Sequence, residues 1–299
     1  MPATLPRKNP AMTVMPEDAP AVETARPNAA TAPGRRISIA GVARGVWRAR
    51  WFISLRAFAT FICLWALLAA WVSSPLQLPS PAKVFDAMVG LAAKGELLSQ
   101  TLISASRLGV ALMVATVIAV PLGFAMALNR ELNTYLDPIV ELLRPISGIA
   151  WIPLGLFIFG VGGTLPVFIM AYVAFFPLLL NTIDGVREID RKLLAASRTM
   201  GITRRAQMVH VMVPAALPSV MVGFRIAFAS AWAAIIAAEL IGSPSGLGFS
   251  IEWYRQLLMS PKVFSFIVLI GVVGYLSDVV LRTVQRKLTP WADGMGIDQ

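Results

Sequence analysis

One stretch of the sequence limits the choice of fold more than any other: no charged residue occurs from Pro145 to Ile183. A helix crosses a bilayer with about 20 apolar residues, so this stretch is too long for one span and suits two. The segment Gly160–Thr164 in its middle has the composition of a tight turn. Backbone polar groups find no water in lipid, and the apolar residues do not alternate with polar ones. We therefore predict two consecutive transmembrane helices rather than strands.

The whole chain shows the same bias. It is 57% hydrophobic and only 14% charged, whereas a soluble domain carries about 25% charged residues. We predict an all-α integral membrane protein whose transmembrane domain covers residues 51–290. Residues 1–50 are rich in Pro, Ala, Thr and Arg and are predicted to form a disordered cytoplasmic tail, with residues 291–299 as a second tail. The six expected transmembrane helices lie near residues 54–72, 103–128, 138–160, 164–183, 217–241 and 263–282.

Basic residues gather on one side of the predicted membrane. They occur in the N-terminal tail, between Arg187 and Arg205, and from Arg282 onward. The predicted outer loops hold only Lys83, Lys94, Arg255 and Lys262. By the positive-inside rule both termini are then cytoplasmic, which requires an even number of spans. Because the basic residues flank apolar segments and do not form an exposed stripe with aromatic residues, we expect a lipid bilayer and no nucleic acid as partner.

The longest polar connection between spans, residues 184–216, holds apolar residues at helical spacing on both sides of Gly201. These residues are Leu193, Leu194, Ala196, Met200, Met208, Val211 and Met212. Glycine commonly ends a helix, so the loop is predicted to form a helix, a glycine turn and a second helix. Such an element can dock into a groove of a partner protein.

Two parts of this loop resemble the EAA loop of ABC-importer permeases: Ala195-Ala196-Ser197 followed by Gly201, and Val211-Met212-Val213-Pro214. The family pattern is Glu-Ala-Ala, three residues, Gly and, further on, a hydrophobic-Leu-Pro element. Here Ala195 replaces the family's Glu, and Ser197 replaces its usual Ala. The resemblance implies that the loop is a coupling helix seated in a cleft of an ATPase subunit. The alternative is an ordinary amphipathic loop helix.

Other segments, in matching order and spacing, resemble the nitrate/sulfonate/taurine branch of that family, which has the MetI-like fold. They are Leu78–Pro81, Leu143–Ile146, Ala150–Leu154, Asn181–Thr182, Ala238–Gly242 and Ser245–Gly248. The resemblance implies a type I ABC importer in the bacterial inner membrane. Its parts would be two copies of this permease as a homodimer, two ATPase subunits that bind ATP and Mg²⁺, and a periplasmic substrate-binding protein. This chain itself would hold no cofactor, and the solute would be a small anion, with sulfonates or taurine ahead of nitrate.

Ionisable residues inside spans are costly to insert, so each is a candidate functional residue. Arg107 and Glu239 lie near the outer ends of the second and fifth spans. Our hypothesis is that they face the interior near the outer mouth of the translocation path and pair there; the alternative is that each extends separately to the interface. Four others near cytoplasmic ends form either structural ion pairs or a gate: Glu141, Arg144, Arg225 and Asp278.

Helix breakers mark the third span: Pro145, Gly148, Pro153 and Gly155. They free backbone groups that only protein or a water-filled path can satisfy, so this span is predicted to line the path. Trp151 either reaches into that path or packs against a neighbour. The predicted path residues are Arg107, Arg144, Trp151, Arg225 and Glu239.

The loop Gly242–Phe249 is rich in glycine but lacks the lysine of a phosphate-binding loop. It is predicted to lie on the outer side, where no ATP is available. By the resemblance, Ser245, Gly246 and Gly248 belong to the surface that receives the substrate-binding protein.

Two other classes remain as alternatives. An ion-coupled secondary transporter would show acidic residues near the bilayer midplane and inverted repeats. An integral membrane enzyme would show clustered His, Asp or Ser at the interface. The chain has one cysteine, Cys63, and one histidine, His210, which is too few for a His/Cys metal site. We expect no catalytic residues in this chain.

Overall fold

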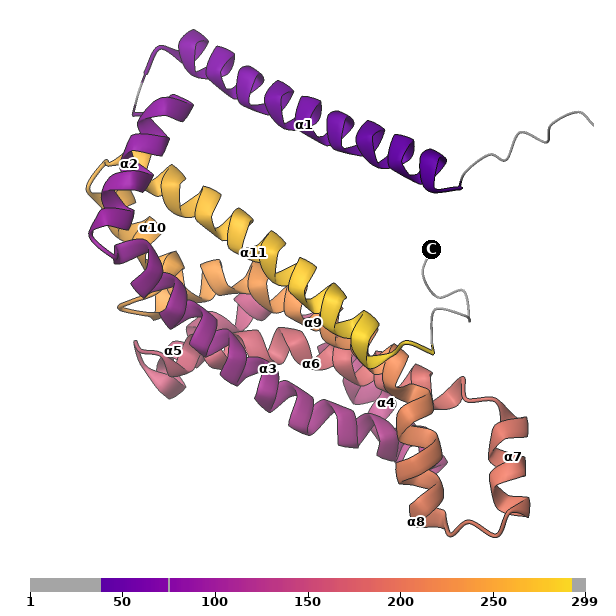
Figure 1. Cartoon of the computed structure of the whole chain (residues 1–299). Coiled ribbons are helices and arrows are strands. Elements are labelled where there is room, and N and C mark those ends of the chain that lie inside the picture. Colours follow the sequence, from indigo (N-terminus) through magenta and orange to yellow (C-terminus); the bar gives the residue numbers. More distant parts are fainter. Residues whose placement is uncertain (1–38, 75, 292–299) are drawn as a thin grey trace, which may run out of the picture. The chain divides into compact units, whose positions relative to one another are not determined.

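The computed structural model describes residues 39–74 and 76–291. These residues form helices and turns, with no strand among them, so the predicted all-α class is confirmed. The elements, labelled as in Figure 1, are α1 (Ile39–Val72), α2 (Pro81–Ala93), α3 (Glu96–Leu128), α4 (Arg130–Leu143), η1 (Gly148–Trp151), α5 (Ile152–Phe159), α6 (Thr164–Arg187), α7 (Arg191–Thr199), α8 (Arg204–Gln207), η2 (Met208–Met212), α9 (Val213–Gly242), α10 (Leu247–Gln256) and α11 (Ser260–Leu288).

The chain divides into a unit that ends at Arg56 and a unit that begins at Ala57. All contacts discussed below belong to the second unit. The predicted tail at residues 1–50 lies outside the described residues up to residue 38, and residues 39–50 begin helix α1. Of the predicted tail at 291–299, residues 292–299 also lie outside the described part.

Five helical stretches are long and apolar enough to cross a membrane. They are Leu55–Val72 in α1, the whole of α3, α6 and α11, and the continuous run Arg204–Gly242. A sixth candidate is the pair formed by α4 and η1–α5, which is bent by 86°. The predicted third span, 138–160, falls on this bent pair and is not one continuous helix.

The bend follows from the helix breakers between α4 and η1. Pro145 has no N–H to donate to the preceding turn, and Ser147 takes an extended conformation with ψ of 136°. Gly148 then lies directly against α6, where a Cβ at this position would come 2.5 Å from Cγ2 of Val173. The breakers therefore redirect the chain along α6.

Helices α3, α6 and α9 pack along one another and form the centre of the bundle (Figure 1). Small residues lie at their contacts: Ala111 and Ala119 on α3, Ala174 on α6, and Ala227 and Ala231 on α9 are each 0% exposed. Small side chains allow backbones to approach closely, which favours helix association where lipid gives no hydrophobic driving force. This core connects two regions at opposite ends of α9: the α9–α10 turn and the loop that contains α7 and α8.

Candidate functional site

Arg107 on α3 and Glu239 near the end of α9 form a buried ion pair. Nη1 of Arg107 lies 2.8 Å from Oε1 of Glu239, and the two side chains are 12% and 0% exposed. The hydroxyl of Ser104, one turn earlier on α3, donates to Oε2 of Glu239 at 2.7 Å. The backbone N–H of Gly248 donates to the same oxygen at 3.1 Å. A buried charge is costly unless it is paired and hydrogen-bonded, and this carboxylate meets both conditions.

The turn between α9 and α10 closes over this pair. The guanidinium of Arg107 donates to the carbonyl oxygen of Ser245 at 2.7 Å and to its hydroxyl oxygen at 2.8 Å. Gly246 has a φ of +108°, and a Cβ there would come 2.4 Å from the carboxylate of Glu239. At Gly248 a Cβ would come 2.6 Å from a backbone oxygen of α9. The turn can therefore sit this close to the ion pair only with glycine at both positions.

The predicted pairing of Arg107 with Glu239 is confirmed, and the alternative of two separate side chains at the interface is wrong. The pair lies beneath the α9–α10 turn, so its assignment to the translocation path stays a prediction. Ser104 was not identified from the sequence, because a serine in an apolar helix is unremarkable by itself. Its spacing of one turn from Arg107 is the signal that could have indicated it.

The three residues predicted to receive a binding protein differ in exposure. Gly246 and Gly248 are buried, and Ser245 is partly exposed with its hydroxyl bonded to Arg107. These residues support the shape of the outer turn. Their contact with a binding protein stays a prediction.

Helix α10 is joined to the start of α3 through Tyr254, whose hydroxyl donates to both carboxylate oxygens of Glu96 at 2.7 and 2.9 Å. The ammonium group of Lys262 lies 4.6 Å from the centroid of the Tyr254 ring. Burial, followed by the hydrogen bond to Glu96 and its charge, raises the pKa of Tyr254 to about 12.

Raising the pH from 10 to 12 is expected to lower the free energy of unfolding. The pKa of Tyr254 is 10.0 in the reference state and about 12 in the folded protein. A raised folded-state pKa gives stability that is present below pH 10 and is lost as the pH rises through about 12. Phenolate absorbance should therefore contain a component with a midpoint near pH 12 that is missing from Tyr254→Phe. A wild-type titration with all components near pH 10 would contradict this assignment.

At the other end of the bundle, Arg225 on α9 contacts Asp278 on α11. Nε of Arg225 lies 2.8 Å from Oδ1 of Asp278, and Nη2 of Arg282 lies 2.7 Å from Oδ2. Of the four charges predicted near cytoplasmic ends, Arg225 and Asp278 therefore form an ion pair. This contact is the one that the alternative of structural ion pairs predicts. Glu141 and Arg144 are exposed, and their side chains have no ion-pair or hydrogen-bond partner within residues 39–74 and 76–291. A gating role for these charges stays a prediction.

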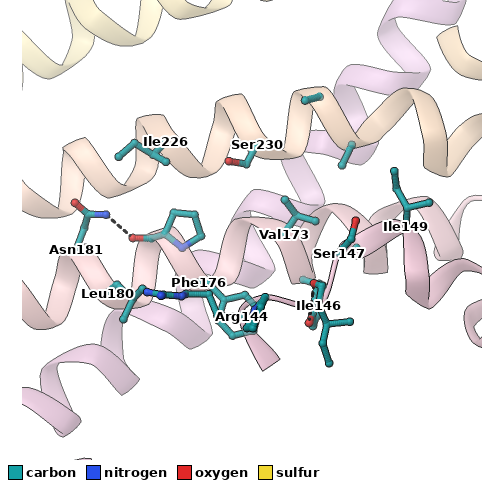
Figure 2. A pocket seen from close by; sticks show the side chains of 16 residues that line it. Arg144, Ile146, Ser147, Ile149, Val173, Phe176, Leu180, Asn181, Ile226 and Ser230 are labelled. Atoms are coloured by element: carbon teal, nitrogen blue, oxygen red, sulfur yellow. Dashed lines mark hydrogen bonds between the residues drawn. The ribbon is translucent and has the colours of Figure 1, made fainter. Parts of the chain in front are cut away.

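A pocket of about 570 Å³ lies between α6, α9 and the segment that precedes α5 (Figure 2). Figure 2 shows Ile226 and Ser230 of α9 opposite Val173 and Asn181 of α6. The walls are mainly apolar. Arg144 is the one charged residue among the described residues that line the pocket. An exposed guanidinium beside apolar walls and small polar groups is suited to binding an anion.

Trp151 packs against Tyr172, with ring centroids 5.6 Å apart, and it does not line this pocket. Its Nε1 atom is buried and has no hydrogen-bond partner in the described part of the chain. Of the two alternatives for Trp151, packing is the contact observed. Substrate contact stays a prediction.

The predicted helix, glycine turn and second helix are confirmed in residues 184–216. Helix α7 is followed by Gly201 with a φ of +73°, then by α8. Gln207 joins the two helices: its Nε2 donates to Oγ of Ser197 at 2.6 Å and to the carbonyl oxygen of Leu194 at 3.0 Å. Gln207 and Ser197 are buried, being 8% and 5% exposed. Gln207 was not identified from the sequence, since a glutamine in a basic loop is normally solvated.

The π-helical turn η2 was also not predicted. In it the N–H of Val213 donates to the carbonyl oxygen of Met208, five residues back. Pro214 follows directly and has no N–H to donate to the carbonyl oxygen of His210. The hydrogen bonds before it can therefore span five residues instead of four. Pro214 is the sequence signal from which this turn could have been anticipated.

The other predicted coupling residues lie on two surfaces. Ala195 and Ala196 are exposed on α7, and Val213 is 42% exposed at the start of α9. Val211 and Pro214 line a hollow of about 700 Å³ beside the end of α6. These positions are open to a partner, but their contact with an ATPase stays a prediction.

Known proteins resemble the chain over most of its length. Residues 119–290 match the family described as the binding-protein-dependent transport system inner membrane component. The chain is 36% identical over 244 residues to a putative ABC transporter permease protein of Methanocaldococcus jannaschii, which covers 80% of this chain and 91% of that protein. It is 32% identical over 254 residues to the taurine transport system permease protein TauC of Escherichia coli, covering 81% and 92%. It is 32% identical over 248 residues to the bicarbonate transport system permease protein CmpB of Synechococcus elongatus, covering 78% and 88%.

A solved structure of the MetNI methionine ABC transporter in an inward-facing conformation shows the same fold. The TM-score is 0.58 at 21% identity, over 64% of this chain and 96% of that one.

Together with these matches, the bundle of apolar helices identifies a multi-pass membrane transport component rather than an enzyme. More specifically, the chain belongs to the family of inner membrane components of binding-protein-dependent transport systems. It is an ABC-importer permease with the MetI-like fold. The family predicted from the EAA-like loop and its flanking motifs is thereby confirmed, and membership in it argues against an ion-coupled secondary transporter.

Proposed function

We propose that this permease forms the translocation path for a small anionic solute and that the pocket containing Arg144 is part of that path. The observation that carries the proposal is an exposed guanidinium without a partner among the described residues, beside an apolar pocket between α6 and α9. A guanidinium that no described protein group neutralises can form charge-assisted hydrogen bonds with an anionic ligand in this pocket.

The names of the relatives support an anion. They include permeases of transport systems for taurine, for aliphatic sulfonates and for bicarbonate. Each of these solutes carries a negatively charged sulfonate or carbonate group. For this chain we propose a sulfonate such as taurine first and nitrate second.

The proposed assembly contains two copies of the permease, two ATPase subunits that bind ATP and Mg²⁺, and a periplasmic substrate-binding protein. Both termini are cytoplasmic, and the loop at residues 184–216 docks on the ATPase through its exposed α7 face. Support comes from Ala195 and Ala196, which are exposed on α7 and have only small side chains at these two positions. The apolar face of α3 that carries Met113 and Val117, 61% and 66% exposed, suits lipid or the second copy. The mass of the purified complex tests this stoichiometry.

The replacement Arg144→Gln is expected to reduce uptake of a sulfonate by about 10- to 100-fold below saturation, because a hydrogen bond to a charged group is typically worth about 1.5–3 kcal/mol. Arg144→Lys keeps the charge and should retain part of the activity. Uptake is measured in proteoliposomes that contain the permease, its ATPase and its binding protein. Arg130→Gln, an equal loss of charge at the other end of α4, is the matched control. Unchanged uptake by Arg144→Gln would remove this pocket from the path.

A further inference from the structure

A second pocket, of about 670 Å³, lies where the end of α3 meets α7 and the run α8–η2. Its apolar lining consists of Leu128, Leu194, Ile202, Met208 and Met212. Its polar lining consists of Gln207, Arg198, Arg204 and Arg205. This pocket shares no lining residue with the pocket of Arg144 or with the hollow of Val211 and Pro214.

The three arginines of this pocket are exposed and have no partner among the residues that the structure describes. In the part of the chain that the structure describes, none of Arg198, Arg204 and Arg205 forms an ion pair or a side-chain hydrogen bond. The described lining residues include no carboxylate. Guanidinium groups present several donors in a planar fork that matches the oxygens of a phosphate group. The rim therefore suits a phosphate-bearing anion.

The pocket also lies at the boundary of two candidate membrane-spanning runs, where α3 ends and α8 begins. Leu128 is the last residue of the candidate span in α3, and Arg204 is the first residue of the run that continues through α9. Met208, 37% exposed, and Met212 continue the apolar lining from this boundary. A ligand that matches both parts of the pocket has an anionic head for the arginines and an acyl chain for the apolar floor.

We propose that this pocket binds an anionic phospholipid of the cytoplasmic leaflet. Basic pockets between transmembrane helices on the cytoplasmic side are suited to such headgroups. A free phosphate would use only the arginine rim, and an acidic protein surface would leave the apolar floor uncovered. Gln207 links α7 to α8 by hydrogen bonds and also lines the pocket. A bound lipid would therefore also stabilise the loop that contains these two helices. The inference is independent of the solute; it rests on the proposed orientation of the chain and on an ATPase contact that uses the exposed α7 face and leaves this pocket open.

The test uses the purified full chain in detergent and measures retained lipid by native mass spectrometry during titration with phosphatidylglycerol. Phosphatidylcholine, which has no net charge, should bind weakly. The double replacement R204Q/R205Q is expected to weaken phosphatidylglycerol binding by about 30-fold, since each basic residue near anionic lipid contributes about a factor of five. R191Q/K192Q removes the same charge from α7 outside the pocket and should leave binding unchanged. R204K/R205K should retain most of it.

Three results would overturn the proposal. Equal losses in the two double glutamine variants would show unspecific attraction to basic charge. Full competition by water-soluble glycerol phosphate would show an anion site that does not use the acyl chain. Normal phosphatidylglycerol binding by R204Q/R205Q, with loss of ATPase binding, would assign the arginines to the ATPase. If R204Q/R205Q does not fold, Met208→Gln places a polar group on the exposed part of the floor and should reduce binding of the same lipid; unchanged binding would equally contradict the proposal.

Discussion

Replacing Glu239 with alanine is expected to destabilise the protein by about 3–5 kcal/mol, the usual cost of removing one partner from a buried ion pair. The Glu239 side chain is 0% exposed and that of Arg107 is 12% exposed. Without the carboxylate, Arg107 keeps its bonds to Ser245 but loses its counter-charge, while Ser104 and the N–H of Gly248 lose an acceptor. Since total stabilities are commonly about 5–15 kcal/mol, this is a large fraction.

Thermal unfolding in detergent and recovery of monodisperse protein measure the effect. Glu252→Ala is the control, because Glu252 pairs with Arg255 one turn later on α10, the two side chains being 16% and 65% exposed, and pairs open to solvent contribute about 1 kcal/mol or less. A Glu239→Ala variant as stable as Glu252→Ala would show that the buried pair does not hold the outer turn.

The variant Glu239→Gln distinguishes a structural role of the Arg107–Glu239 pair from a role of its charge in the translocation path. Glutamine keeps the shape and can still accept from Ser104, so its stability should fall less than that of the alanine variant. If the variant is stable and transports normally, the pair is structural. If it is stable and transport is lost, the charge itself is needed for transport. Exchanging the two charges should not rescue function, because an arginine at 239 would direct its donors at the N–H of Gly248.

The sequence predicted this pair from energetics alone. A charge inside a span must be satisfied, and Arg107 and Glu239 were the two charges predicted inside spans near their outer ends. The other hydrogen-bond partners of this ion pair could not be predicted from the sequence. The hydroxyl of Ser104 and the backbone of residues 245–248 become partners only through the packing of α3 against α9, a long-range arrangement with no local signature.

The third span shows the same division between local and long-range information. Pro145 and Gly148 indicated a weak point in the helix, which is a local property. The 86° bend depends on the close approach of Gly148 to Val173 on α6, where a Cβ would come 2.5 Å from that side chain. Proline and glycine predict that a helix is interrupted, but the neighbouring helix decides the direction in which the chain continues.

Replacing Gln207 with leucine is expected to uncouple transport from ATP hydrolysis while leaving the bundle folded. Leucine has a similar volume but cannot donate to Ser197 and Leu194, so α7 loses its hydrogen-bonded tie to α8. A lost buried hydrogen bond costs about 1–3 kcal/mol. We expect this cost to fall mainly on the orientation of α7, because α7 contacts the protein chiefly through α8 and η2, and within the described residues only its Leu194 packs against a core cluster.

If the proposed coupling is correct, a loosened α7 transmits less of the ATPase movement to α9. If the free energy of the coupled orientation of α7 rises by about 1.4 kcal/mol, the amount of solute transported per ATP falls about tenfold. The measurement is transport and ATP hydrolysis in the same proteoliposomes, with thermal unfolding as the check on folding. Thr199→Val is the matched control, because the Thr199 hydroxyl donates only within α7, to the carbonyl oxygen of Ala196. A Gln207→Leu permease that keeps the wild-type ratio of transport to hydrolysis would show that the tie between α7 and α8 does not carry the coupling.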